Sequence, residues 1–228
     1  MDLPEPLVKY GPVPITALRQ RMLEQPADFW TVDRASRVML AGDRPGNAVF
    51  FYNDMPAATA RPVLAEAKSS GVINVLRYAD RPLFAEIQAL IDDKLRPLFP
   101  NCDVMRVQLA ELPPGEVIKP HRDLNILSLI HRMHVPIVTH PMVKFIIAGK
   151  TFFLAEGELY DLNNAVVHSV ENQSTVMRVH LMIDMLPHSV ARARYFDDEA
   201  TMLAACAPAM VQAQQPVRFS PMPPGGMR

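Results

Sequence analysis

Between residues 103 and 186 the chain alternates short apolar runs with turn-forming clusters. Runs of this length, with apolar and polar residues alternating, are typical of β-strands, and the glycines and asparagines between them tolerate tight turns. The chain also holds 22 prolines and only 9 glycines, and so many prolines oppose a bundle of long helices. We therefore predict a β-sandwich or barrel. Its strands are expected at 104–110, 126–138, 143–148, 151–154 and 176–183.

Helical patterns lie on both sides of this β segment. Apolar residues within 15–23 share one helical face. A second helix is expected from Asp80, which can cap it, to Pro97, which should end it. Weaker helices are expected at 62–68 and from residue 197. The sequence thus predicts a single domain over 1–228, with a mixed α/β layer at 1–100, the β core at 101–186, and a C-terminal helix and tail at 187–228.

Charge and hydropathy narrow the functions open to the chain. The formal net charge is −1, and no run of lysine or arginine occurs, so no nucleic-acid partner is expected. No apolar stretch approaches the roughly 20 residues of a membrane span, and the first residues resemble no signal peptide. We therefore expect a cytoplasmic protein without a membrane partner, and the sequence leaves its oligomeric state open. Cys102 and Cys206 share no motif, so core thiols are expected rather than a disulfide or a zinc site.

The candidate chemistry begins at His121 and Asp123, which stand two residues apart. On a β-strand this spacing directs both side chains to one face, so an imidazole and a carboxylate could bind the same metal ion. His168 could join them from a neighbouring antiparallel strand. Two histidines and one carboxylate form the ligand set associated with non-haem Fe(II) oxygenases. Taken alone, a His-x-Asp pair favours an ordinary hydrogen-bonded pair, and that alternative stays open.

Two further segments carry cations among apolar residues. Arg178 and His180 alternate with apolar neighbours, so both point to one face of the expected strand, and Arg132 and His134 repeat the pattern. An arginine in so apolar a strand is costly unless it meets an anion, and its guanidinium is well shaped to hold a carboxylate. We therefore predict a cationic pocket, beside the metal, that accepts a dicarboxylate. Taken singly, each of these residues could instead be a satisfied core or rim residue.

A series of short motifs runs from Pro114 to Asp184. They are Pro114-Gly115, Pro120-His121-Arg122-Asp123, Arg132-Met133-His134-Val135-Pro136, Gly157-Glu158, His168-Ser169-Val170-Glu171-Asn172 and Arg178-Val179-His180-Leu181. In this order and spacing they resemble the aspartyl/asparaginyl β-hydroxylase family of 2-oxoglutarate-dependent oxygenases. The resemblance implies a double-stranded β-helix, or jelly roll. An N-terminal helical layer and a helical C-terminal appendage would flank it.

The resemblance also implies a role for each polar residue of the site. The ligands of Fe(II) would be His121, Asp123 and His168. Arg178 matches the arginine that binds the distal carboxylate of the co-substrate 2-oxoglutarate. Arg132 and His134 match the pair near its metal-chelating carboxylate. The family uses O2 and releases succinate and CO2, so these products are expected here as well.

The metal ligands suggest a branch of the family. Some members lack the carboxylate ligand, whereas this chain has Asp123, so it resembles the soluble bacterial branch, whose substrates include free amino acids. The expected reaction is hydroxylation of an unactivated C–H bond in an amino acid, or in an amino-acid-derived small molecule or peptide. The alternatives are a cupin-type metal enzyme that does not use 2-oxoglutarate and a non-catalytic jelly roll that binds a small molecule.

Candidate substrate contacts follow from strand alternation. Some relatives have a serine against the co-substrate where this chain has Ala110. If Ala110 faces the cavity, Arg106 and Gln108 face it too. Arg106 could equally be a solvated charge at a strand end. Other residues that could reach the mouth of the site are Asn125, Asn164, Asn163 and Tyr160.

Overall fold

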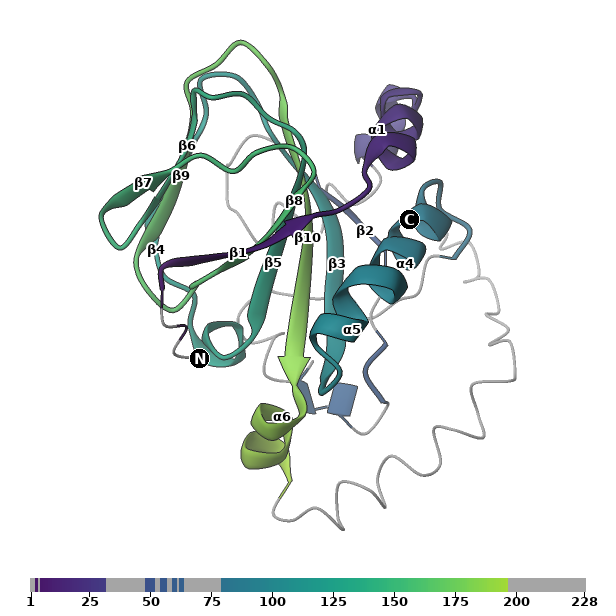
Figure 1. Cartoon of the computed structure of the whole chain (residues 1–228), viewed down its shortest axis with the longest axis vertical. Helices are drawn as coiled ribbons and strands as arrows, with labels where there is room; N and C mark the ends of the chain where they lie inside the picture. The colour runs from purple at the N-terminus through teal and green to yellow at the C-terminus, as the bar shows by residue number, and fades with distance from the viewer. Residues whose placement is uncertain are drawn as a thin grey trace, which may run out of the picture.

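Two antiparallel β-sheets pack face to face at the centre of the protein, as the computed structural model shows (Figure 1). The structure describes residues 3, 5–31, 48–51, 54–56, 59–60, 62–63 and 79–196. Leu112 and Leu162 of one sheet share a buried apolar cluster with Phe145 and Val170 of the other. Sheets packed in this way form a β-sandwich, the architecture to which the jelly roll belongs, and the predicted mainly β fold class is confirmed.

The larger sheet has the strand order β1-β8-β5-β10-β3-β2, with every neighbouring pair antiparallel. Its strands are β1 (Leu7–Pro12), β2 (Ala48–Phe50), β3 (Cys102–Leu112), β5 (His131–Val138), β8 (Glu158–Leu162) and β10 (Arg178–Pro187). The N-terminal segment supplies both edge strands, β1 and β2. Residues before 100 therefore extend the central sheet as well as covering it.

The smaller sheet has the strand order β4-β9-β6-β7. Its strands are β4 (Val117–His121), β6 (Val143–Ile147), β7 (Lys150–Phe152) and β9 (His168–Asn172). β4 and β9 pair in antiparallel register, with His121 opposite His168. Two histidines far apart in the sequence are therefore neighbours at the ends of these two strands.

Alternation along β10 separates an apolar face from a polar one. Val179, Leu181 and Ile183 belong to the largest buried apolar cluster, on the side that the helices cover. The intervening residues Arg178, His180 and Asp184 are also buried, on the opposite face, which looks toward the smaller sheet. The same alternation occurs in β5. A polar lining is thus enclosed between the two sheets.

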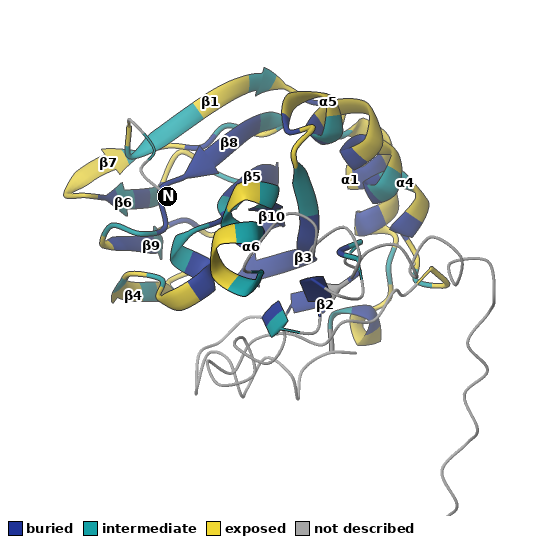
Figure 2. Ribbon diagram, turned by 90° about the horizontal axis from the view of Figure 1, so that it is seen from below, coloured by how far each residue is buried: buried dark blue, intermediate teal, exposed yellow. Residues whose placement is uncertain are grey.

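Helices cover the outer face of the larger sheet (Figure 2). The predicted helix at 15–23 is confirmed as α1 (Thr16–Leu23), which buries Leu18 and Met22. The next helical segment comprises α4 (Phe84–Leu90), one π-helical turn (Ile91–Leu95) and α5 (Arg96–Leu98).

This second helical segment differs from its prediction at both ends. It begins after Leu83, a residue with φ of 72°, rather than at Asp80. Pro97 lies inside its last turn instead of ending it. The π-helical turn, which ends two residues before Pro97, lets the helix continue through this proline. Proline lacks the N–H of an ordinary helical hydrogen bond, and a π turn shifts the bonding pattern.

Other predicted elements have different bounds or lie outside the description. The run 126–138 is split, since a 3₁₀-helix (Asn125–Ser128) precedes β5. A helix that the sequence did not predict, α6 (His188–Tyr195), directly follows β10. The helix predicted from residue 197 and Cys206 lie outside the described residues, as does most of 62–68. Within the described part of the chain, no helix is long and apolar enough to cross a membrane.

Candidate active site

The three predicted metal ligands converge at the ends of β4 and β9. His121 is the last residue of β4 and His168 the first of β9, and their ring centroids lie 4.3 Å apart. With Asp123 they form a group whose donor atoms all lie within 4.8 Å of one another. His121 Nε2 and Asp123 Oδ1 are 4.0 Å apart. The side-chain atoms of all three residues can therefore reach one ion.

Asp123 reaches this position by a route that the sequence did not predict. It lies beyond the end of β4, so the two residues do not share a strand and the argument from strand alternation is wrong here. A loop contact takes its place: the backbone N–H of Asp123 donates to the carbonyl of Asn164 at 2.9 Å. The side chain of Asn164 in turn donates to the carbonyl of Leu127. Asn164 thus ties the loop of Asp123 to the segment that leads to His168.

Backbone carbonyls orient both histidine rings. His121 Nδ1 lies 2.8 Å from the carbonyl of Lys119, and His168 Nδ1 lies 2.9 Å from that of Val166. Because a carbonyl can only accept, Nδ1 carries the proton in each ring, which leaves Nε2 as the donor for a metal. Burial, with a contribution from His121, also lowers the pKa of His168. The neutral form, which binds metals, is therefore favoured at His168.

A chain of alternating charges leads from the ligands into the interior. Arg132 contacts the Asp123 carboxylate through Nη1. The same guanidinium holds Asp184 with two bonds, Nε to Oδ1 at 2.9 Å and Nη2 to Oδ2 at 3.3 Å. Arg106 Nη2 lies 2.5 Å from the same carboxylate. Burial alone would raise the pKa of Asp184, but the two guanidinium groups outweigh it and hold that pKa below its ordinary value.

Asp184 is a site residue that sequence reasoning missed. It stands in the same apolar strand as Arg178, at an even spacing, so alternation already placed it on the polar face. A carboxylate in an apolar strand needs a cation as much as an arginine needs an anion. The signal was present, but only the fold shows that its partners are Arg106 and Arg132.

The second part of the polar lining is a pair of buried histidines. Nδ1 of His134 and Nδ1 of His180 lie 3.3 Å apart, and both rings contact Phe145. Burial, with the nearby Arg178 and Arg132, lowers the pKa of His134 to about 3, and burial and Arg178 keep the pKa of His180 well below its ordinary value. Both histidines are therefore neutral, and the positive charge of the lining comes from its arginines.

The residues expected to contact substrate lie in different surroundings. Arg106 is buried against Asp184, and Gln108 Nε2 lies 3.4 Å from Met182 Sδ. The Tyr160 hydroxyl accepts from the backbone N–H of Ala155, and Asn163 Oδ1 accepts from the backbone N–H of Ala165. Asn125 is exposed beside the metal loop. The interior residues thus serve hydrogen bonds or ion pairs within the protein, whereas Asn125 lies at the surface.

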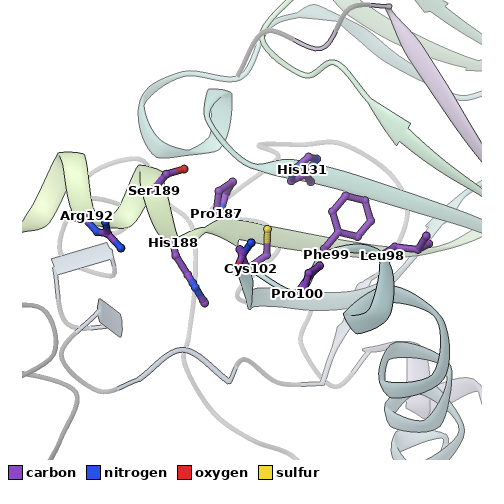
Figure 3. A pocket seen from close by; sticks show the side chains of 10 residues that line it. Leu98, Phe99, Pro100, Cys102, His131, Pro187, His188, Ser189 and Arg192 are labelled. Atoms are coloured by element: carbon purple, nitrogen blue, oxygen red, sulfur yellow. The ribbon is translucent and has the colours of Figure 1, made fainter. Parts of the chain in front are cut away.

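A separate pocket of about 480 Å³ opens beside the N-terminus of α6 (Figure 3). Its lining includes Cys102, His131 and His188. His131 Nδ1 lies 2.6 Å from Asp161 Oδ2, and His188 Nε2 lies 3.2 Å from Asp103 Oδ1. Burial, then Asp103 and Asp161, raises the pKa of the Cys102 thiol to about 11. The pocket contains none of the three metal-ligand candidates, and its thiol is protonated at neutral pH.

The fold and the site together define a class of protein. A jelly roll that brings two histidines and a carboxylate together at a polar cavity is the framework of a non-haem metal-dependent oxygenase. Residues 77–187 match the model of the family described as aspartyl/asparaginyl beta-hydroxylase. The matched segment is similar to that family, and the chain is a dioxygenase of the hydroxylase type.

Solved structures provide more distant likenesses. An oxidoreductase of the 2OG-Fe(II) oxygenase family from Burkholderia pseudomallei has a TM-score of 0.46 at 13% identity, over 68% of this chain and 78% of that one. The viral collagen prolyl hydroxylase of Paramecium bursaria Chlorella virus-1, in complex with 2OG, has a TM-score of 0.44 at 8% identity, over 79% and 96%. A Pseudomonas putida prolyl-4-hydroxylase has a TM-score of 0.42 at 14% identity, over 80% and 92%.

These structures are too distant to carry the assignment, which rests on the family match to residues 77–187 and on the site geometry. A comparison with curated proteins found no match.

Proposed function

We propose that this chain is an Fe(II)- and 2-oxoglutarate-dependent dioxygenase that hydroxylates an amino acid, or an amino-acid-derived small molecule or peptide. The observation that carries the proposal is the convergence of His121, Asp123 and His168 on one point. Their donor set is two imidazole nitrogens and one carboxylate, which suits Fe(II) and leaves coordination positions for other ligands. The family match to residues 77–187 supports the same chemistry.

The proposed metal fits the donors. Each imidazole is held by a carbonyl at Nδ1, so its Nε2 lone pair is available without a change of tautomer. Asp123 offers Oδ1 on the side of His121, while Arg132 contacts its Oδ2. When bound, the iron would supply the oxidising chemistry that couples conversion of 2-oxoglutarate and O2 into succinate and CO2 to hydroxylation of a C–H bond.

The proposed co-substrate fits the lining beside the metal. Arg178 is buried on the inner face of β10, the face that carries the polar lining. Its guanidinium can bind the distal carboxylate of 2-oxoglutarate with two parallel hydrogen bonds. His134 is neutral and buried, so it can donate a hydrogen bond to the other carboxylate without adding charge. Apolar surroundings strengthen both interactions because they exclude water.

An optical titration tests this proposal. Fe(II) and then 2-oxoglutarate are added to the protein without oxygen, and the weak visible charge-transfer band of the iron chelate is recorded. The band should appear only with both additions, and His168→Ala should remove it. Arg122→Ala is the matched control, because Arg122 is exposed and lies between the two ligands His121 and Asp123. A protein that binds Fe(II) but develops no band with 2-oxoglutarate would favour the cupin-type alternative.

The substrate class needs its own measurement. Succinate formation is coupled to a panel of free amino acids and short peptides, and the products are analysed by mass for the addition of one oxygen atom. Stimulation by at least one amino acid or amino-acid derivative, with hydroxylated product in equal amount to succinate, supports the substrate class. Succinate formation that none of them stimulates would contradict it.

A further inference from the structure

We propose that Asp184 is a positioning residue for the metal site, acting through Arg132 on the ligand Asp123. The inference rests on the proposed metal role of Asp123 and adds to it a residue that touches neither metal nor co-substrate. Asp184 lies on β10 and is only 1% exposed. Asp184 can therefore influence the metal site only through the guanidinium groups that contact it.

The geometry of Arg132 carries the proposal. Asp184 holds Arg132 by its Nε and Nη2 atoms, which is a two-point contact that fixes the plane of the guanidinium. Nη1 is left to point toward Asp123, and it contacts Oδ2 of that carboxylate. A single contact to Arg132 would allow rotation of the group, whereas the fork held at two points directs Nη1 to one place.

The two oxygens of Asp123 are distinguished by this contact. Oδ1 lies 4.0 Å from His121 Nε2, on the side where the other donor atoms converge. Oδ2 is occupied by Arg132. Asp123 lies in the loop beyond the end of β4, where the carbonyl of Asn164 holds its backbone N–H and Arg132 contacts its carboxylate. The contact with Arg132 therefore selects which oxygen faces a metal, as hydrogen bonds to ligating carboxylates commonly do.

Arg106 makes Asp184 indispensable to the arrangement. Arg106 and Arg132 are both buried and share the Asp184 carboxylate. Nε of Arg106 is buried without a hydrogen-bond partner among the described residues, so the carboxylate is the main compensation for its charge. The guanidinium groups of Arg106 and Arg132 alternate with the carboxylates of Asp184 and Asp123, so the charges of these four side chains balance. Without Asp184, Arg106 would lose its carboxylate partner and Arg132 would keep only Asp123, so the site would hold an uncompensated buried cation.

The test measures metal binding by the protein itself rather than turnover. Co(II) serves as the probe, and its affinity and visible absorption spectrum are recorded for the wild type and for Asp184→Asn. We expect Asp184→Asn to weaken Co(II) binding by about 10- to 100-fold, the usual effect of losing a residue that orients a metal ligand. The spectrum should also change, because the carboxylate no longer presents the same oxygen. Unchanged affinity and spectrum would overturn the proposal.

A double-mutant cycle separates positioning from general damage. In an Asp123→Ala background the carboxylate ligand is absent, so Asp184→Asn should cause no further loss of Co(II) affinity. An equal loss in both backgrounds would mean that Asp184 acts on the fold and not through Asp123. Asp103→Asn is the control, because Asp103 is a partly buried carboxylate that pairs with His188 beside the pocket at α6 and has no contact with Arg132 or Asp123 among the described interactions. It should lower stability and leave the Co(II) spectrum intact.

A charge-balanced variant covers the case in which Asp184→Asn does not fold. Arg106→Met combined with Asp184→Asn removes one charge of each sign and leaves Arg132 with Asp123. Co(II) binding should stay weak in this variant, because Arg132 still lacks its two-point partner, and wild-type affinity would refute the inference. The proposed function fails in a different way, namely if the wild type itself binds no metal or shows no response to 2-oxoglutarate.

Discussion

The imidazole of His180 lies parallel to the ring of Phe145, with centroids 5.3 Å apart and planes 9° from parallel. The two residues come from opposite sheets, β10 and β6. Their contact joins the polar lining of the larger sheet to the apolar cluster between the sheets. Nε2 of His180 is buried and has no hydrogen-bond partner in the described part of the chain. Protonation of this ring would therefore place a charge in an apolar contact.

This contact predicts loss of stability in mild acid. The folded-state pKa of His180 is well below its ordinary value, and that of His134 is about 3. The unfolded chain binds protons at these residues below about pH 6.5, whereas the folded protein does not. The free energy of unfolding should therefore fall as the pH drops below about 6.5, by up to about 1.4 kcal/mol per pH unit for each histidine.

Urea unfolding of the metal-free protein at pH 7.5 and 5.5 measures this effect. His180→Phe keeps a ring against Phe145 and removes one titrating group, so its stability should depend less steeply on pH than that of the wild type. An identical slope in the variant would show that His180 is accessible to protons in the folded state.

Replacing Arg178 should separate co-substrate binding from metal binding. Arg178→Met keeps much of the side-chain length but loses the charged hydrogen bonds to a carboxylate, each worth about 1.5–3 kcal/mol. The Kd for 2-oxoglutarate should therefore rise by about 10- to 100-fold, while Co(II) affinity stays near that of the wild type. Calorimetric titrations of each ligand check both values. A parallel loss of metal and co-substrate affinity would indicate a structural role for Arg178.

Removing the ring of Phe145 should destabilise the junction of the two sheets. The side chain is 1% exposed and contacts both His134 and His180. Phe145→Ala should lower the free energy of unfolding by about 3–5 kcal/mol, since it combines lost apolar burial with a cavity. Phe153→Ala is the control, because Phe153 is 45% exposed, and its effect in the same urea titration should be much smaller.

Cys102 should react slowly with alkylating reagents in the native protein. Its pKa of about 11 leaves little thiolate at pH 8, and the side chain is partly buried against the main apolar cluster. Mass spectrometry of a Cys206→Ser variant, which keeps Cys102 as its one thiol, can follow modification by iodoacetamide. Denaturation in urea should accelerate the reaction strongly. Equal rates in both conditions would contradict the raised pKa.

Local patterns of polar and apolar residues predicted much of the fold. The alternation of polar and apolar residues in β5 and β10 correctly separated the faces of both strands. The periodicity at 15–23 correctly predicted α1. The short edge strands β1 and β2 were not predicted, because edge strands are held by pairing with β8 and β3 rather than by a strong pattern of their own.

The sequence predicted the residues of the site but not all of the contacts that place them. Asp123 shows the reason. Its residue type and its nearness to His121 were sufficient to mark it as a ligand candidate. The stated reason, a shared strand, was wrong, because β4 ends at His121 and a contact with the backbone of Asn164 places Asp123 instead. That contact joins residues far apart in the chain, and no local spacing rule contains it.

By itself, the amino-acid sequence determined the mainly β architecture, the polar face of β10 and the residue types of the metal site, since these follow from side-chain chemistry and a two-residue period. Only the tertiary structure decided which charges meet. Asp184 pairs with both Arg106 and Arg132, and of these two arginines Arg132 also contacts Asp123. The physical reason is that a buried charge requires a partner of opposite sign, but the chain's fold decides which of several candidates comes within reach.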